Sequence, residues 1–176
     1  MADASLVGSS LPPQAVAPTL VFGVGNPSRG DDAVGPMLIE RLQQRQEAGG
    51  LRGVDLLTDF QLQVEHALDL IDRQRVIFVD AAVGLRVPFC LSAIEPAATL
   101  SWTTHSLTPA GLVRLYRSLY GDPPRMELLA IGAERFELGS PLSQQTEINL
   151  EAATRGLLST LGDADSSGPA TPVTTI

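Results

Sequence analysis

The stretch FGVGNPSRGDDAVGP, residues 22–36, joins the end of an apolar strand to a glycine-rich turn and the start of a helix. A turn of this kind after a strand often binds phosphate, because the free amides at a helix start attract anions. Here the turn instead brings two carboxylates, Asp31 and Asp32, to the start of the helix. The stretch therefore predicts an α/β fold whose first turn faces a positively charged ligand.

Strand-like and helix-like segments alternate along the rest of the chain. Apolar and β-branched runs predict strands at residues 19–25, 54–58, 75–82, 88–95 and 125–133, and helical spacing predicts helices at 31–47, 62–72, 106–120 and 143–161, the last beginning at a Ser143 cap. This order is typical of a three-layer α/β/α sandwich around a five-stranded, mostly parallel sheet. About six residues join the third strand to the fourth, too few for a parallel crossover, so we expect the fourth strand to be antiparallel.

The length and the two ends indicate the domain organisation. The chain has 176 residues, enough for one domain with a substantial core, and we assign residues 19–161 to that single α/β domain. Residues 1–18 are rich in Ala, Ser and Pro without a helical or strand period, and residues 162–176 are small and polar. We therefore expect a flexible N-terminal segment and a disordered C-terminal tail.

Composition excludes several classes of function. The net charge is −8 and every basic residue is an arginine, with no basic run, so neither nucleic acid nor a membrane surface is expected as a partner. The single cysteine, Cys90, excludes an internal disulfide and argues against a cysteine-based zinc site. The sequence shows no secretory signal and no membrane-spanning run, so we expect a cytoplasmic protein.

Two other interpretations of the first turn remain to be weighed. Gly23 and Gly25 begin a dinucleotide-binding pattern, but Ser28 stands where its third glycine is needed. A phosphate about 4 Å from Asp31 or Asp32 would be repelled by roughly 4 kcal/mol at an effective dielectric constant near 20. Alternatively, an aspartate simply caps the helix and gains about 0.3–1 kcal/mol from its dipole, which explains one carboxylate but not two.

Two more residues are expected at the same edge of the sheet as the turn. Asp80 closes the third strand, and His105 immediately precedes the helix that follows the antiparallel strand. Ligands of open α/β sheets bind at this carboxyl edge, so Asp32, Asp80 and His105 form a candidate site for a divalent first-row metal with open coordination positions. Capping is the alternative role for Asp80 and for His105, and we interpret His66 and Glu65 as surface residues of their helix.

Three motifs resemble, in the same order, those of the [NiFe]-hydrogenase maturation endopeptidases: GVGNPSRGDDAVG (23–35), VIFVDAAV (76–83) and THSLTPAGLV (104–113). The family's first motif reads Gly-x-Gly-Asn, four variable residues, Asp-Asp/Glu, then Gly/Ala-x-Gly, and it is matched here by Gly23, Gly25, Asn26, Asp31, Asp32, Ala33 and Gly35. The resemblance runs from about Leu20 to Leu161. It implies a phosphorylase/hydrolase-like sheet with an antiparallel fourth strand.

The resemblance also implies an activity. Asp32, Asp80 and His105 would be the catalytic residues and would contact nickel, which is supplied by the precursor of the hydrogenase large subunit rather than stored by the enzyme. Removal of a C-terminal extension from that precursor would complete metallocentre assembly. The metal could polarise the scissile carbonyl, activate a water or only position the bond. Two alternatives are a nickel-binding assembly module that does not cleave and a nucleotide-binding protein.

The sequence departs from the family pattern near the expected cleft. Position 32 is Asp where many members have Glu, and the family's Asp-Gly-Gly-Thr segment is replaced here by Asp59, Phe60, Gln61 and Leu62. The resemblance implies that this loop helps to select the substrate. Together with TDFQLQVEHALDL (58–70), it is most similar to the branch that serves soluble, NAD-reducing or bidirectional hydrogenases.

The remaining residues of the first motif are expected to support the turn. We assign Gly23, Gly25 and Asn26 to holding its backbone. Asp31 would either cap the helix or hold the metal-contacting residues in place without touching the metal.

Overall fold

The computed structural model describes residues 16–95 and 107–162. Within these ranges the elements are, in chain order, β1 (Thr19–Val24), the 3-10 helix η1 (Gly30–Ala33), α1 (Val34–Glu47), β2 (Val54–Asp59), the 3-10 helix η2 (Val64–Leu70), β3 (Arg75–Val83), β4 (Phe89–Ala93), α2 (Pro109–Tyr120), β5 (Arg125–Ala133) and α3 (Gln144–Gly162). The predictions for residues 1–15, for residues 163–176 and for His105 lie outside the described residues.

The strands form one five-stranded mixed sheet in the order β2-β1-β3-β5-β4. All neighbouring pairs are parallel except β4 and β5, which are antiparallel. Only residues 84–88 separate β3 from β4, a link too short to carry the chain back across the sheet. The predicted fold class and the antiparallel fourth strand are therefore confirmed.

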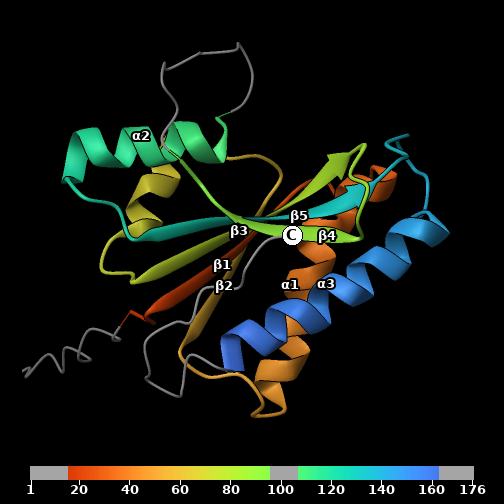
Figure 1. Cartoon of the computed structure of the whole chain (residues 1–176), viewed down its shortest axis with the longest axis horizontal. Helices are drawn as coiled ribbons and strands as arrows, with labels where there is room; N and C mark the ends of the chain where they lie inside the picture. The colour runs from red at the N-terminus through yellow and green to blue at the C-terminus, as the bar shows by residue number, and fades with distance from the viewer. Residues whose placement is uncertain (1–15, 96–106, 163–176) are drawn as a thin grey trace, which may run out of the picture.

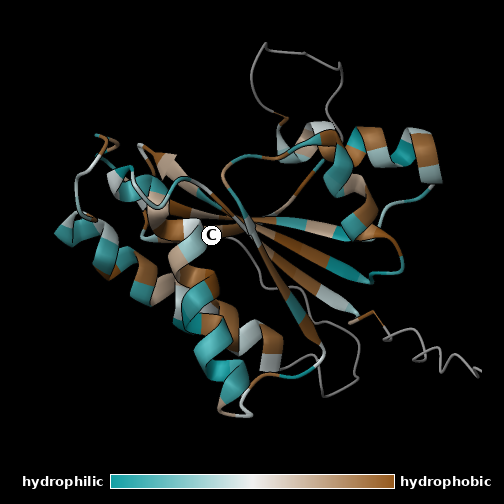
Figure 2. Cartoon of the chain, turned by 180° about the vertical axis from the view of Figure 1, so that it is seen from behind, coloured by the Kyte–Doolittle hydropathy of each residue, from teal (hydrophilic) through white to brown (hydrophobic). Residues whose placement is uncertain are grey.

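Helices cover both faces of this sheet (Figure 1). On one face, α1 and α3 pack against a cluster of buried residues that includes Val21, Ile77 and Val79. On the other face, η2 and α2 pack against a second cluster that includes Phe22 and Phe78. Neighbouring residues of a strand point to opposite faces, so a strand that is apolar throughout contributes side chains to both clusters. Figure 2 shows largely apolar strands and polar outer faces on the helices.

One predicted helix has a different geometry. The segment expected as an α-helix over 62–72 is the 3-10 helix η2, and two of its apolar residues, Val64 and Leu68, are exposed. Ala67 and Leu70 are buried in their place. Residues three apart share a face in a 3-10 helix, so Ala67 and Leu70 face the core together. The first predicted helix likewise starts with a 3-10 turn, η1, before α1.

Candidate active site

The turn after β1 depends on close backbone contacts. Gly25 has a φ of +140°, and a Cβ at this position would lie 1.9 Å from the carbonyl oxygen of Asp32. Any other residue would therefore displace the helix start. The Asn26 side-chain oxygen accepts the N–H of Ser28 at 2.9 Å, and its carbonyl accepts the N–H of Arg29 at 3.0 Å. Through these contacts Asn26 links three consecutive parts of the turn, the backbone of residues 26, 28 and 29.

Gly23 serves the same turn by allowing the helix to approach the strand. A Cβ on Gly23 would lie 2.5 Å from the carbonyl oxygen of Gly35 in α1, and a Cβ on Gly35 would lie 2.2 Å from that of Val24. A side chain at either position would push α1 away from β1. This close approach places η1, and with it Asp32, directly above the end of β1.

Asp32, in η1 after β1, and Asp80, in the neighbouring strand β3, line the same pocket. Asp32 is half-buried, and its Oδ2 accepts the N–H of Asn26 at 3.0 Å. Asp80 is the first residue of β3 beyond the register shared with β1, which ends at the pair Gly23 and Val79. Its Oδ1 accepts the N–H of Ala81 at 2.8 Å. Asp80 therefore lies within β3, at the point where β1 leaves the sheet, and it does not close the strand as predicted.

The electrostatics of this pair favour a bound cation. Burial raises the pKa of Asp80 from 3.8 to about 6; the hydrogen bond from Ala81 opposes the rise and the negative charge of Asp32 adds to it. A positive charge between the two carboxylates would stabilise both in their ionised form.

The pocket that holds the pair has a volume of about 310 Å³ and lies at the carboxyl ends of β1 and β3. The chain leaves β1 toward β2 on one side and later enters β3 on the other, so this is the switch point where ligands of such sheets bind. The described residues that line it are Val24, Gly25, Asp32, Phe60, Gln61, Leu62, Asp80, Leu107, Thr108 and Pro109.

The histidine predicted as the third ligand, His105, lies outside the described residues. Within residues 16–95 and 107–162, no group of three His, Cys, Asp or Glu side chains could hold a metal ion. The N-cap of α2 is Thr108, whose Oγ1 accepts the N–H of Gly111 at 3.1 Å, so the capping role considered for His105 belongs to Thr108. Leu107, close behind His105 in the chain, lines the pocket.

Asp31 faces away from this pocket and is fully buried. It accepts hydrogen bonds from the backbone N–H groups of Glu134, Arg135 and Ser143, at 2.7–2.9 Å, and from the hydroxyls of Ser143 and Thr146, at 2.9 and 2.8 Å. Burial alone would raise its pKa, but these donors lower it from 3.8 to about 2. Asp31 does not cap its own helix; it ties the first turn to the end of β5 and to the start of α3.

Sequence reasoning had no local signal for this network, because every donor lies more than a hundred residues further along the chain. It did identify Ser143 as the cap of α3, and the structure confirms this: the Ser143 Oγ accepts the N–H of Thr146 at 3.3 Å.

The loop predicted to select the substrate borders the pocket. Phe60 has an exposed fraction of 67%, Gln61 is also exposed, and both line the pocket beside Asp32 and Asp80. Leu62 is only 4% exposed and belongs to the core cluster under η2 and α2. The loop thus presents Phe60 and Gln61 to a ligand, while Leu62 anchors it.

The prediction that His66 is a plain surface residue is wrong. Its side chain is 14% exposed, and its Nε2 lies 3.2 Å from Oδ2 of Asp59. Its Nδ1 accepts the N–H of Gln63 at 2.9 Å, and its ring meets that of Phe22 edge-on with centroids 4.7 Å apart. The sequence offered only a weak signal for this pairing, because His66 follows Asp59, the last residue of a strand, by a few residues.

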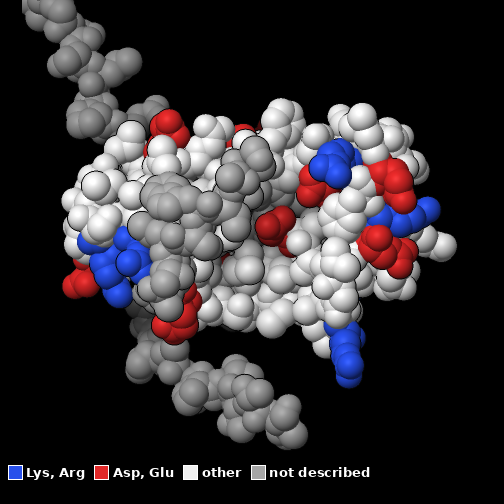
Figure 3. Space-filling view, turned by 90° about the horizontal axis from the view of Figure 1, so that it is seen from above, with Lys and Arg blue, Asp and Glu red and all other residues white. Residues whose placement is uncertain are grey.

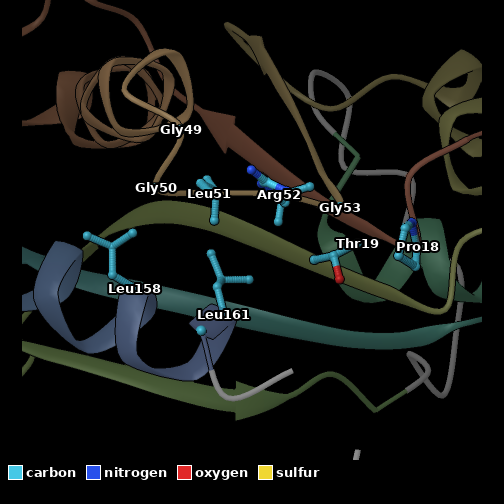
Figure 4. A pocket seen from close by; sticks show the side chains of 11 residues that line it. Pro18, Thr19, Gly49, Gly50, Leu51, Arg52, Gly53, Leu158 and Leu161 are labelled. Atoms are coloured by element: carbon cyan, nitrogen blue, oxygen red, sulfur yellow. The ribbon is translucent and has the colours of Figure 1, made fainter. Parts of the chain in front are cut away.

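A slightly larger pocket, of about 330 Å³, lies at the opposite, amino-terminal edge of the sheet (Figure 4). It is bounded by the link 49–53 and by Leu158 and Leu161 of α3. Arg52 is the one charged side chain among the described residues that line it. With no carboxylate in its described lining, this pocket is not suited to a cation.

The charges on the described surface agree with the absence of a basic run in the sequence. On the face shown in Figure 3, arginines stand in separate groups toward the ends, and an acidic side chain sits in a central hollow. Among the helices of residues 16–95 and 107–162, none combines the length and the apolar character needed to cross a membrane.

Comparison with known proteins gives structural matches. No protein-family model and no curated protein sequence matches the chain. The chain is similar to the [NiFe] hydrogenase maturation protease HycI from Thermococcus kodakarensis, with a TM-score of 0.64 and 22% identity, over 83% of this chain and 93% of that one.

Two further matches have slightly higher identity. The hydrogenase maturating endopeptidase HybD from Escherichia coli is 25% identical, with a TM-score of 0.63 over 83% of this chain and 93% of that one. A hydrogenase 2 maturation peptidase from a Thaumarchaeota archaeon is 26% identical, with a TM-score of 0.58 over 82% of this chain and 97% of that one. The chain therefore has the fold of these enzymes, and its structural homologues are hydrogenase maturation endopeptidases, which are peptidase hydrolases.

Proposed function

We propose that this chain is a nickel-dependent endopeptidase that removes the C-terminal extension from the precursor of a [NiFe]-hydrogenase large subunit. The observation that supports this most directly is the meeting of Asp32 and Asp80 in one pocket at the switch point of the sheet. The fold around that pocket is shared with hydrogenase maturation endopeptidases.

The chemistry of the pocket fits the role proposed for its residues. Two carboxylates supply oxygen ligands, and an imidazole from His105 would complete a mixed set suited to a divalent first-row metal. Three protein ligands leave positions open for groups of the substrate. In our proposal the nickel belongs to the precursor, so the protease reads the presence of the metal in its substrate.

The residues of this chain would orient that contact. The N–H of Asn26 holds the Asp32 carboxylate, and the N–H of Ala81 holds that of Asp80. Leu62 and Leu107 contribute apolar side chains to the lining of the pocket. Bound nickel would supply a Lewis acid near the scissile peptide bond.

We further propose that the substrate belongs to a soluble, NAD-reducing or bidirectional hydrogenase. This rests on the loop Asp59, Phe60, Gln61 and Leu62, whose resemblance to that branch was noted above, and on its place at the rim of the pocket.

The test is incubation with precursor that either contains nickel or lacks it, followed by mass measurement of the large subunit. We expect the nickel-containing precursor alone to be shortened. Equal cleavage of both forms would contradict nickel dependence. An unchanged mass, with the chain bound to the nickel-containing precursor, would favour the non-catalytic assembly module.

A further inference from the structure

His66 is a largely buried, titratable side chain that the proposed chemistry does not use. It lies on η2, outside the pocket of Asp32 and Asp80, and it contacts both the core and the loop that precedes η2. Its ring edge packs on Phe22 in the core, and its two nitrogens face the loop that leads from β2 to η2.

One hydrogen bond of the ring identifies its tautomer. Nδ1 accepts the backbone N–H of Gln63 at 2.9 Å, so this nitrogen carries a lone pair. The proton of the neutral ring is therefore on Nε2, which lies within ion-pair distance of Asp59, 3.2 Å from its Oδ2.

Asp59 also contacts two residues at the rim of the candidate site. Its Oδ1 accepts the N–H of Phe60 at 2.6 Å, and its backbone carbonyl accepts the N–H of Gly25 at 3.1 Å. The carboxylate thus links His66 to the exposed Phe60, while the backbone links the same loop to the glycine turn. The Phe60 side chain lies between two hollows, since it lines both the pocket of Asp32 and Asp80 and a neighbouring pocket of about 300 Å³.

We propose that His66 is a positioning residue for the substrate: as the Nε2–H tautomer it holds Asp59 and thereby fixes Phe60 at the wall between the two pockets. The inference rests on the proposed function, because the substrate is taken to be a peptide that crosses this wall. His66 acts through Asp59 and does not touch the reacting bond. Its loss should weaken substrate binding more than the cleavage step.

A pair of substitutions separates the two polar contacts of the ring, the hydrogen bond from Gln63 and the contact with Asp59. In His66→Asn the amide lies near the former Nδ1 and can still accept from Gln63, but it cannot reach Asp59. In His66→Gln the amide reaches the former Nε2 and can still donate to Asp59. We expect His66→Asn to raise KM about tenfold with kcat within about twofold, the effect of one hydrogen bond to a charged group, and His66→Gln to stay within about threefold of the wild type. Glu65→Gln, an exposed neighbour on η2, is the matched control.

A measurement without substrate tests the positioning itself. The chain has two histidines, so nitrogen-15 shifts of His66 are readily assigned, and they should show the Nε2–H form. Exchange of the Phe60 amide hydrogen should be roughly tenfold faster in His66→Asn and nearly unchanged in His66→Gln. Faster exchange in the Gln variant than in the Asn variant would show that His66 only holds Gln63, and would overturn the proposal.

The two measurements also separate this inference from the proposed function. If the wild-type chain does not shorten the precursor, the peptidase assignment fails, and the exchange data still decide whether His66 positions Phe60. If the wild type cleaves and both His66 variants match it in KM, the proposal for His66 is wrong while the peptidase assignment stands.

Discussion

Asp31 and Asp32 are neighbours in the chain, yet their carboxylates lie in opposite environments. Asp31 is fully buried and accepts five hydrogen bonds from the end of β5 and the start of α3. Asp32 is half-buried and accepts a hydrogen bond from Asn26, beside the half-buried carboxylate of Asp80. A 3-10 turn can direct two consecutive side chains to different sides, and here one side is the core and the other a pocket.

The surroundings of each carboxylate determine whether it is available to an external ligand. The charge of Asp31 is satisfied within the protein, and its pKa is lowered to about 2. The charges of Asp32 and Asp80 are incompletely satisfied, and the pKa of Asp80 is raised to about 6 by burial and, in smaller part, by Asp32. Ionised groups that the protein itself does not satisfy are available to an external cation.

The largest expected effect is on activity, at Asp32. Asp32→Ala should reduce processing of nickel-containing precursor by at least about 10³-fold, because the proposed contact with the metal is lost. Stability in urea should change by less than about 1 kcal/mol, as is usual for side chains outside the core. Cleavage kinetics followed by mass spectrometry, together with urea unfolding, would check this. A cleavage rate close to that of the wild type would remove Asp32 from the site.

The next effect is on folding, at Asp31. Asp31→Ala leaves several buried donors without an acceptor and should lower the free energy of unfolding by about 3–5 kcal/mol. The shift in the urea midpoint measures it. If Asp31→Ala unfolds no more readily than Asp32→Ala, the contrast between the two neighbours is wrong.

Low pH should weaken the hydrogen-bond network of Asp31 and lower the stability of the protein. The pKa of Asp31 is lowered in the folded state, so its contribution to stability is fully present above its unfolded value of 3.8 and is lost as the pH falls toward 2. That contribution is about 2 kcal/mol at neutral pH. Urea midpoints between pH 2 and pH 7 should fall less steeply for Asp31→Asn than for the wild type; parallel curves would contradict the assignment.

The smallest expected effect on stability is at Asp80, where the substitution should stabilise the protein instead of destabilising it. Its pKa is raised in the folded state, so the ionised carboxylate costs stability above pH 4, and the full cost is reached above about pH 6. Asp80→Asn should therefore stabilise the metal-free protein at pH 7.5 by about 1 kcal/mol, a figure reduced because the pocket is open to water, while processing is lost. Thermal unfolding of the metal-free variant at pH 7.5 and pH 4 is the test, and the gain should vanish at pH 4.

Much of the fold could be predicted because its causes are local. Apolar runs and turn lengths determine the alternation of strands and helices, and the short link 84–88 forces β4 to run antiparallel to β5. The pairing of Asp32 with Asp80 also followed, since parallel strands bring their carboxyl ends to one edge. The partners of Asp31 and of His66 could not be predicted. They depend on how β5 and α3 dock against the first turn, and on η2 being a 3-10 helix.

The network of Asp31 has a consequence for the order of events during synthesis. Its acceptor atoms belong to the first loop of the domain, and its donors come from residues 134–146, near the end. A nascent chain that has released β1 to β4 from the ribosome still lacks these donors, so the loop that carries Asp32 cannot be locked until the last helix emerges. The first turn therefore gains its full set of hydrogen bonds only when the start of α3 is present, and a chain that stops before α3 should be inert toward the precursor.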